Sequence, residues 1–165
     1  MKIVITEEQD DKLKENLLKL KKNLLTLIKQ FGVLGTINRV GYEKFNSIYP
    51  DYFKINFKNN RDKIELLNEI ISNGEEEDNG EIRLDTIGAD ILIRTEILDE
   101  GHILEHYIDY ITKDKCGVTI WEYDEEGSMY DEYYDTYDIW LEDLKTPILN
   151  QIFDMVLRFY KNILR

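Results

Sequence analysis

The stretch "ILEHYIDYITKDKCGVTIWEYD" (residues 103–124) decides the fold class of this 165-residue chain. Its apolar and polar residues alternate, which is the period of a β-strand that buries one face. The run "KDKCG" (113–117) interrupts the alternation and is typical of a turn. The stretch therefore predicts an antiparallel hairpin with strands at 103–112 and 118–124.

Similar patterns lie on both sides of this hairpin. The segments "EIRLDTIG" (81–88), "ADILIRTEIL" (89–98) and "MYDEYYDTYDIW" (129–140) predict further strands, and "DEGH" (99–102) and "EEGS" (125–128) predict turns between them. Short turns between consecutive strands predict an antiparallel meander of four to five strands. Thr146 as N-cap and Pro147 at the first helical position then start a C-terminal helix that packs on the sheet.

The N-terminal half shows helical periodicity instead. Thr6 and Gln9 have the spacing of a capping box, which predicts a helix that ends at Phe31–Gly32. Leucines repeat along it at heptad spacing, so it either packs on its own domain or associates with a second chain. These association residues are Leu13, Leu17, Leu20, Leu24 and Leu27.

Shorter helices are expected after this one. Residues 34–40 and 42–48 form two, and residues 61–72 form a third, with Asn60 as its cap. Its predicted inward residues are Ile64, Leu67, Ile70 and Ile71.

The loop "NGEEEDNG" (73–80) is the predicted boundary, because the hydrophobic period changes there from 3.6 to 2. The sequence thus predicts an α+β fold, with a helical region at 1–73 and the sheet with its C-terminal helix at 80–165. The length also suits one compact domain.

Charge is distributed unevenly along the chain. The net charge is −13, with +3 over residues 1–74, −19 over 75–143 and +3 over 144–165. An acidic block of this size repels phosphate and attracts cations or basic proteins. It also keeps a tyrosine-rich sheet soluble.

The acidic tyrosine strip "MYDEYYDTYD" (129–138) holds four tyrosines and four carboxylates, distributed over both faces of a strand. Buried carboxylates without partners are costly, so an edge strand is expected. Tyrosine is enriched at interfaces, and interleaved carboxylates pair with Lys or Arg of a partner. The predicted partner-binding residues are Tyr123, Asp124, Tyr130, Asp131, Glu132, Tyr133, Tyr134, Asp135 and Tyr137.

Signals for catalysis are weak. Lys113 and Lys115 flank Cys116 and would lower its pKa, but no histidine is tied to this cysteine in sequence. Nucleophile-elbow, phosphate-loop, dinucleotide and paired-cysteine motifs are absent from the sequence. We therefore expect no enzyme activity and no cofactor.

Two patterns resemble metal sites. Glu122, Asp124 and Glu126 begin like a calcium loop, but Tyr133 stands where a bidentate Glu is needed. His102 and His106 are four residues apart, which on a strand is about 13 Å. We expect two surface histidines and no metal site.

Residues 32–48 have the length and glycine placement of a helix-turn-helix, which would present Arg39, Lys44 and Lys54 to DNA. The basic surplus is too small for a phosphate-tracking surface, so direct nucleic-acid binding is not expected. A single cysteine favours a reducing, intracellular setting. The sequence contains no run of 18 apolar residues, so we expect no membrane span.

The opening "MKIVITEEQ" and the glycine-spaced "IKQFGVLGTINRVGYEKFNSIYPDYF" resemble small uncharacterised accessory proteins of tailed phages and related mobile elements. The resemblance covers about the first 55 residues and carries over no functional residue. It implies a virion-associated part, or an accessory factor in the cytoplasm of a bacterial host.

Two functions remain open from the sequence. The first is a non-catalytic protein-interaction or structural protein, which contacts a basic partner or a second copy of itself through the leucine helix and the acidic tyrosine strip. The alternative is a nucleic-acid mimic, in which carboxylates along residues 124–143 replace phosphates in the basic cleft of a host DNA-processing or defence protein.

Overall fold

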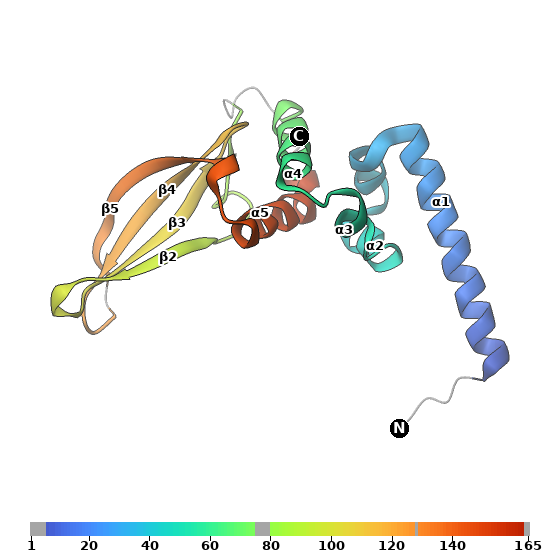
Figure 1. Ribbon diagram of the computed structural model, residues 1–165, viewed down its shortest axis with the longest axis horizontal. Coiled ribbons are helices and arrows are strands. Elements are labelled where there is room, and N and C mark those ends of the chain that lie inside the picture. The colour runs from blue at the N-terminus through green and yellow to red at the C-terminus, as the bar shows by residue number, and fades with distance from the viewer. Residues whose placement is uncertain (1–5, 75–79, 128, 164–165) are drawn as a thin grey trace. The chain divides into compact units, whose positions relative to one another are not determined.

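A computed structural model of the chain describes residues 6–74, 80–127 and 129–163, with the backbone alone at 129–134. The chain forms two compact units that divide between Asn56 and Phe57. The first unit is helical and the second contains the sheet, so the fold is α+β as predicted (Figure 1).

Helix α1 (Glu7–Val40) begins at the predicted capping box. The Gln9 backbone N–H donates to Thr6 Oγ1 (3.2 Å), and the Thr6 N–H donates to Gln9 Oε1 (3.1 Å). The predicted end at Phe31–Gly32 is a kink instead, because Gly32 has φ 76° and ψ 174° and helical structure resumes beyond it. Glycine adopts a positive φ without the steric cost that a side chain would bring.

Two short helices complete the first unit, α2 (Tyr42–Ile48) and α3 (Tyr52–Asn56). Their aromatic rings pack edge to face, with 5.3 Å between the centroids of Phe45 and Tyr52. Tyr52 also contacts Phe53, at 5.4 Å between ring centroids. Phe45 is fully buried, so these rings form the core of the unit.

The second unit begins with α4 (Asn60–Ser72), which starts one residue earlier than predicted. Asn59 is the cap, because its side-chain oxygen accepts the Asp62 backbone N–H (2.9 Å). Leu66 is buried with the predicted Leu67, Ile70 and Ile71, and Ile64 is half-buried. Helix α4 packs with the C-terminal helix of this unit, whereas the sequence had grouped it with residues 1–73.

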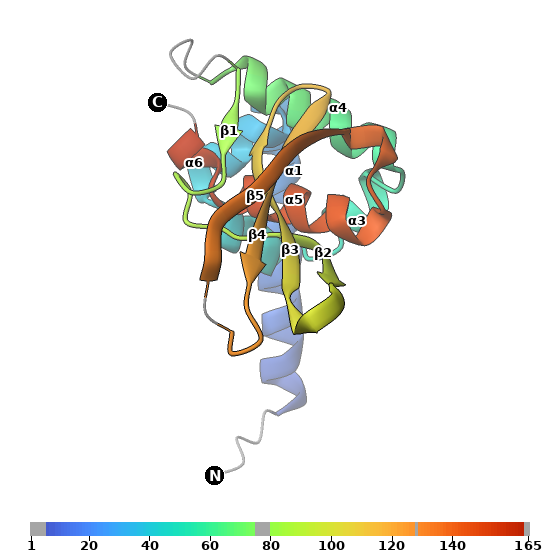
Figure 2. The same ribbon diagram turned by 90° about the vertical axis from the view of Figure 1, so that its left-hand side faces the viewer.

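Five antiparallel strands make one sheet: β1 (Ile82–Arg83), β2 (Leu92–Ile97), β3 (Ile103–Ile111), β4 (Lys115–Tyr123) and β5 (Met129–Trp140). Strands β2 to β5 follow one another as the predicted meander, and β1 and β2 pair with different parts of β3 (Figure 2). Among the described strands β5 pairs only with β4, so the predicted edge position of the acidic tyrosine strip is confirmed.

Two strand predictions were wrong in extent. The segment 81–88 forms only the two-residue β1, and the chain then leaves the strand as a loop, residues 84–91. Cys116 and Gly117 belong to β4 and not to a turn, because Cys116 pairs with Ile111 and the hairpin loop consists of Lys113 and Asp114. The Thr112 N–H donates to the Lys115 carbonyl (2.7 Å), which closes this tight loop.

A short 3-10 turn, η2 (Asp99–Gly101), joins β2 to β3. A second one, η3 (Leu141–Asp143), connects β5 to helix α5 (Thr146–Arg158). The short helix α6 (Tyr160–Ile163) follows α5. Lys145 occupies the cap position of α5. Thr146, the predicted cap, is the first helical residue, and its hydroxyl accepts a hydrogen bond from Asn60 Nδ2 (3.1 Å). Figure 1 shows α4 and α5 on the same side of the sheet. No helix in the described ranges is long and apolar enough to cross a membrane.

Candidate functional site

The two faces of the sheet differ in chemistry. On the inner face Leu104, Ile108, Cys116, Val118 and Ile120 are buried, and they form the sheet's share of the core of the second unit. The outer face carries side chains that are only half-buried. These outer residues are Glu105, Tyr107, Thr119, Trp121 and Tyr123. Aromatic rings that stay partly in water next to carboxylates are typical of an interaction surface.

A recess of about 400 Å³ lies on the outer face. Its aromatic lining is Tyr107 from β3 with Trp121 and Tyr123 from β4, and Thr119 lies among them. Leu84, Asp85, Ala89 and Asp90 of the loop 84–91, together with Ile108 and Asp109 of β3, complete the lining. We call this set the outer recess. No lysine or arginine is among the described residues that line it.

The loop 84–91 is held in place by backbone hydrogen bonds to β3. The Leu84 N–H donates to the Asp109 carbonyl (3.0 Å), and the Ile108 N–H donates to the Ile91 carbonyl (3.0 Å). Leu84, Ile87 and Ile91 are buried and anchor the loop. The backbone of the loop is therefore part of the folded unit, and it places Asp85 and Asp90 in the lining with the aromatic rings.

Negative charge dominates the electrostatics of the outer recess. The Tyr107 hydroxyl donates to Glu105 Oε2 (3.1 Å). Burial and this hydrogen bond, with the nearby charges of Glu105 and Asp90, raise the pKa of Tyr107 to about 12. Burial and the same two carboxylates also raise the pKa of Tyr123. Both phenols remain neutral near pH 7, while the carboxylates around them favour a cation.

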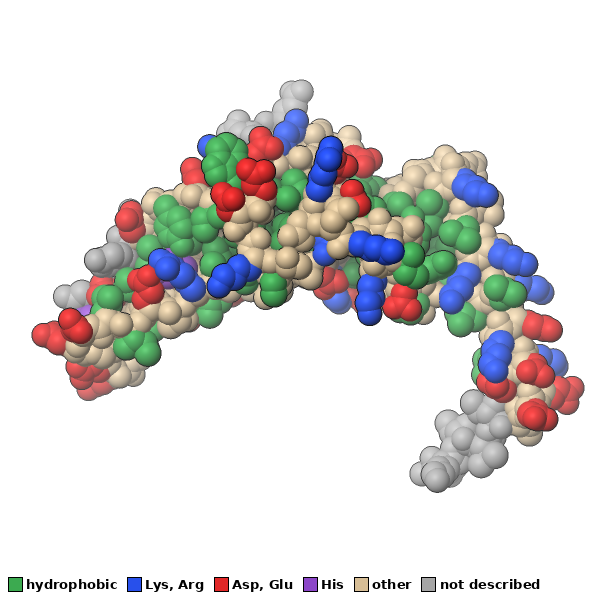
Figure 3. All heavy atoms as spheres, in the orientation of Figure 1, with side chains coloured by type: hydrophobic (Ala, Val, Ile, Leu, Met, Phe, Trp, Pro, Cys, Tyr) green, Lys and Arg blue, Asp and Glu red, His purple; other side chains and the backbone are tan. Residues whose placement is uncertain are grey.

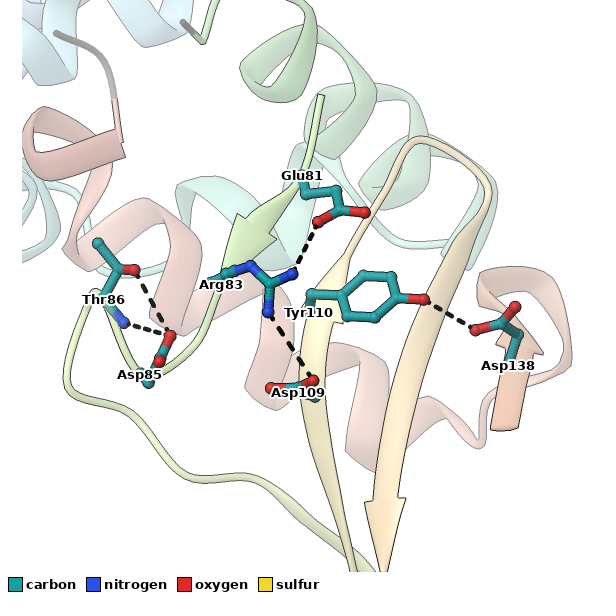
Figure 4. Close-up of polar contacts among 7 residues, drawn as sticks. All are labelled: Glu81, Arg83, Asp85, Thr86, Asp109, Tyr110 and Asp138. Carbon is teal, nitrogen blue, oxygen red and sulfur yellow. Dashed lines mark hydrogen bonds and ion pairs between the residues drawn. The ribbon is translucent and has the colours of Figure 1, made fainter. Parts of the chain in front are cut away.

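The three carboxylates of the recess differ in their partners. Asp109 lies 4.0 Å from the Arg83 guanidinium, which also contacts Glu81 (3.5 Å). Asp85 accepts the Thr86 backbone N–H (2.8 Å), as Figure 4 shows. Asp90 is exposed, and its carboxylate makes no hydrogen bond or ion pair with any residue that the structure describes. Asp90 is therefore the carboxylate most available to a ligand.

A second hollow of similar volume lies between the start of α4 and the end of β5. Arg61, Glu65, Asp114, Trp140 and Glu142 are among its lining residues, so it carries both signs of charge. The Lys115 ammonium already lies 4.4 Å from the Trp140 ring centroid. This hollow has an internal cation where the outer recess has none.

The inner face also carries a polar group, at the part of the sheet near β2. His106 is 1% exposed, and its Nδ1 lies 2.8 Å from the Tyr137 hydroxyl. Its Nε2 lies 3.6 Å from Glu96, which forms an ion pair with Arg94 (2.7 Å). The prediction of two surface histidines was wrong for His106, because its ring lies on the inner face of the sheet, where Tyr137 of β5 partners Nδ1 and no described residue forms a hydrogen bond with the buried Nε2.

The predicted partner-binding residues do not lie together on one face of the sheet. Opposite Val118 and Ile120, Tyr137 and Asp135 lie on the inner-face side, whereas Tyr123 lies in the outer recess. Asp124 lies in the turn before β5, where its side chain accepts the Glu126 N–H (3.0 Å). The side chains of five predicted partner-binding residues lie outside the described part of the chain; these are Tyr130, Asp131, Glu132, Tyr133 and Tyr134.

The association helix is exposed over its first half. Leu13, Leu17 and Leu20 are 55%, 41% and 42% exposed, whereas Leu24 is buried and Leu27 is half-buried. In Figure 3, lysine and arginine side chains lie along this unit, and Asp and Glu side chains gather at the start of α1 as well as at the hairpin end of the sheet. The heptad seam thus continues beyond the part that is buried.

The structure describes Cys116 and Glu122, which belong to the cysteine and calcium-like patterns of the sequence. Cys116 is fully buried, and burial together with the negative charge of Asp138 raises its pKa to about 11, contrary to the lowering expected from Lys113 and Lys115. Glu122 of the calcium-like pattern is buried and lies 3.1 Å from His102 Nδ1. Within the described ranges, no group of three or more His, Cys, Asp or Glu residues has the geometry to hold a metal ion.

Sequence reasoning placed Tyr123 in the site but missed Tyr107, Trp121 and the loop carboxylates. The alternation in residues 103–111 and 118–123 carried a signal, since it places Tyr107, Trp121 and Tyr123 on one face of adjacent strands. The loop carboxylates gave no such signal, because only tertiary pairing brings residue 90 beside residue 107.

Comparison with known proteins finds no matching family model, no similar curated protein and no similar solved structure.

Proposed function

We propose that the protein is a non-catalytic interaction protein whose outer sheet face binds a basic segment of a protein partner. The observation that carries this proposal is the outer recess, where aromatic rings and carboxylates meet without an internal cation. Tyrosine and tryptophan supply large contact area at low entropic cost, and carboxylates around them select a positively charged partner. The −19 charge of residues 75–143 attracts such a partner over a longer range.

Self-association through α1 is a second surface of the same interaction protein. The exposed Leu13, Leu17 and Leu20 continue the heptad seam beyond the buried Leu24. Two copies of the seam would bury these leucines against each other. Two linked outer recesses would then bind a partner that carries repeated basic segments more tightly than one recess does.

The resemblance of the N-terminal segment indicates the kind of setting, which is a virion or the cytoplasm of a bacterial host. In either setting, basic protein segments that handle nucleic acids are abundant. Nucleic-acid mimicry remains the alternative function. A mimic needs carboxylates on one continuous face, and Asp135 and Asp138 point to opposite faces of β5. We therefore favour recognition at the outer recess.

A pull-down from bacterial lysate tests the proposed function. The bait is the full chain at roughly 50 and 300 mM salt, between which the Debye length changes about twofold. Asp90→Lys reverses the free carboxylate of the outer recess, and Glu142→Lys makes the same change in net charge at the second hollow. We expect a basic partner that the wild type captures at low salt, that Asp90→Lys loses and that Glu142→Lys retains.

Two other results would contradict the proposal. Equal loss with both variants would mean that net charge alone attracts the partner. Release of the partner by added duplex DNA, with no difference between the two variants, would favour the mimic, because a mimic and DNA compete for one basic cleft.

A further inference from the structure

We propose that the outer recess is a binding site for the guanidinium group of an arginine side chain. This inference rests on the proposed function, since it names the group by which a basic partner is recognised. It commits the site to one side chain that enters between the loop 84–91 and the aromatic residues of β3 and β4.

The size of the recess suits one long side chain. Its volume of about 400 Å³ lies near the lower end of the range for ligand pockets, about 300–1,000 Å³. The lining combines the aromatic Tyr107, Trp121 and Tyr123 with the carboxylates of Asp85, Asp90 and Asp109, so a ligand inside meets both kinds of group. A long side chain bound in the recess can place its aliphatic stem along Tyr107 and its charge near Asp90 at the rim.

The aromatic lining favours a cation over a neutral polar group. A cation near the face of Trp or Tyr is attracted by the ring quadrupole, with Trp the strongest. The chain uses this contact elsewhere: the Arg39 guanidinium lies 3.4 Å from the Phe31 ring centroid, and the Lys115 ammonium lies 4.4 Å from that of Trp140. Trp121 and Tyr123 line a recess in which no described Lys or Arg occupies this place.

The carboxylates supply the remaining interaction. Asp90 has no partner among the described residues, so its oxygens are available to N–H donors. Glu105 holds the Tyr107 hydroxyl, and its charge adds to the negative potential of the site. An anion is disfavoured there, and an apolar ligand would leave the Asp90 charge without compensation.

Arginine fits this combination better than lysine. The guanidinium is planar and weakly hydrated, so it stacks on an aromatic ring while its edge donates two hydrogen bonds to a carboxylate. An ammonium keeps more of its water and lacks a flat face. The site is therefore expected to bind Arg more tightly than Lys, and to ignore a neutral side chain of the same shape.

Trp121 provides a direct reporter, because the chain has two tryptophans and the other is Trp140. In the full chain with Trp140→Phe, the fluorescence of Trp121 is followed while blocked Gly-Arg-Gly, Gly-Lys-Gly or Gly-citrulline-Gly peptide is added. Citrulline is the neutral isostere of arginine. We expect a saturable change with Arg, a weaker one with Lys and none with citrulline.

Variants separate the site from general charge. Asp90→Asn removes the negative charge and keeps the size of the side chain. It should weaken Arg binding roughly two- to fivefold, as for an ion pair at the rim of a site. Glu142→Gln at the second hollow should leave it unchanged. Equal urea midpoints confirm that both variants fold. Equal responses to arginine and citrulline, or no saturable response to arginine, would overturn the proposal.

The outcomes also distinguish this inference from the proposed function. If Asp90→Lys abolishes partner capture but the Arg peptide fails to bind, the outer face binds its partner through another group and the arginine site is wrong. If the Arg peptide binds but Asp90→Lys captures the partner normally, the recess is a site for small cations and the proposed function is wrong.

Discussion

The ring of Tyr110 lies directly over Gly117 on the outer face of the sheet. A Cβ on Gly117 would lie 2.2 Å from Tyr110 Cε1, well inside van der Waals contact. With no side chain beneath it, Tyr110 reaches across β4 and donates a hydrogen bond to Asp138 of β5 (3.1 Å), as Figure 4 shows. One glycine thus permits a side-chain contact that joins three strands.

Gly117→Ala should therefore destabilise the second unit by about 1–3 kcal/mol, the usual cost of overpacking. In the Tyr110→Ala background, Gly117→Ala should cost little, because the ring that clashes is already absent. In the Tyr110→Phe background it should keep its full cost, since Phe keeps the ring and lacks only the hydroxyl. Urea unfolding of the single and double variants measures these differences, and additive losses would contradict the assigned clash.

The pKa of Tyr107 predicts a change in stability at alkaline pH. Its folded pKa is about 12, above the ordinary value of 10.0, because burial and Glu105 favour the neutral phenol. The contribution of Tyr107 to stability is complete below pH 10 and is lost as the pH rises through 12. Glu105→Gln should lower the pKa of Tyr107 toward 10.

Ultraviolet titration of tyrosinate tests this shift. The chain has 11 tyrosines, so the titration of Tyr107→Phe is subtracted from that of the wild type, and likewise in the Glu105→Gln background. The subtracted curve should move to lower pH in that background. If the two subtracted curves coincide, Glu105 does not hold the Tyr107 proton.

Cys116 should be protected from thiol reagents while the protein is folded. It is fully buried in β4, and its pKa is raised to about 11, so both access and thiolate are lacking. At pH 8 a disulfide reagent should modify the native protein roughly 10³-fold or more slowly than the urea-unfolded protein, since reaction requires opening of the sheet. Rapid modification of native protein would show that β4 is accessible.

The α1 seam should control self-association. Leu17→Glu with Leu20→Glu places charge on the seam and should convert any dimer to a monomer in sedimentation equilibrium. Leu18→Glu with Leu25→Glu is the matched control, because these leucines are 55% and 40% exposed but lie off the heptad positions. A wild-type chain that is monomeric at all concentrations would mean that the seam is covered in cis or by a different protein.

The sequence predicted the parts of the fold that depend on local pattern. Alternating apolar and polar residues placed β3, and the Thr6–Gln9 spacing placed the start of α1. The errors came where tertiary pairing decides. Lys113, Asp114 and Lys115 are polar, which is typical of a longer turn. The pairing of Ile111 with Cys116 instead extends both strands and leaves only a short loop between them. The sequence predicts a surface position for His106, because its hydrogen-bond partner Tyr137 lies on β5, which is not adjacent to β3.

The candidate site was only partly predictable for the same reason. Charge distribution indicated a basic partner and the tyrosines indicated an interface, but these signals pointed to the strand at 129–140. The outer recess needs Tyr107 and Trp121 on adjacent strands and a loop that returns to the edge of β3. The backbone hydrogen bonds from Leu84 to Asp109 and from Ile108 to Ile91 hold this loop against β3. They bring Asp90 into the lining of the recess, which the sequence alone does not show.

The most direct test of the central claim is amide chemical-shift mapping of the full chain during titration with an arginine-rich peptide. We predict that the largest shifts fall on the loop 84–91 and on the outer-face residues Tyr107, Trp121 and Tyr123, with saturation at a common peptide concentration. Shifts confined to α1 or to the acidic tyrosine strip, or small shifts at acidic residues throughout the chain, would contradict the assignment of the outer recess as the binding site.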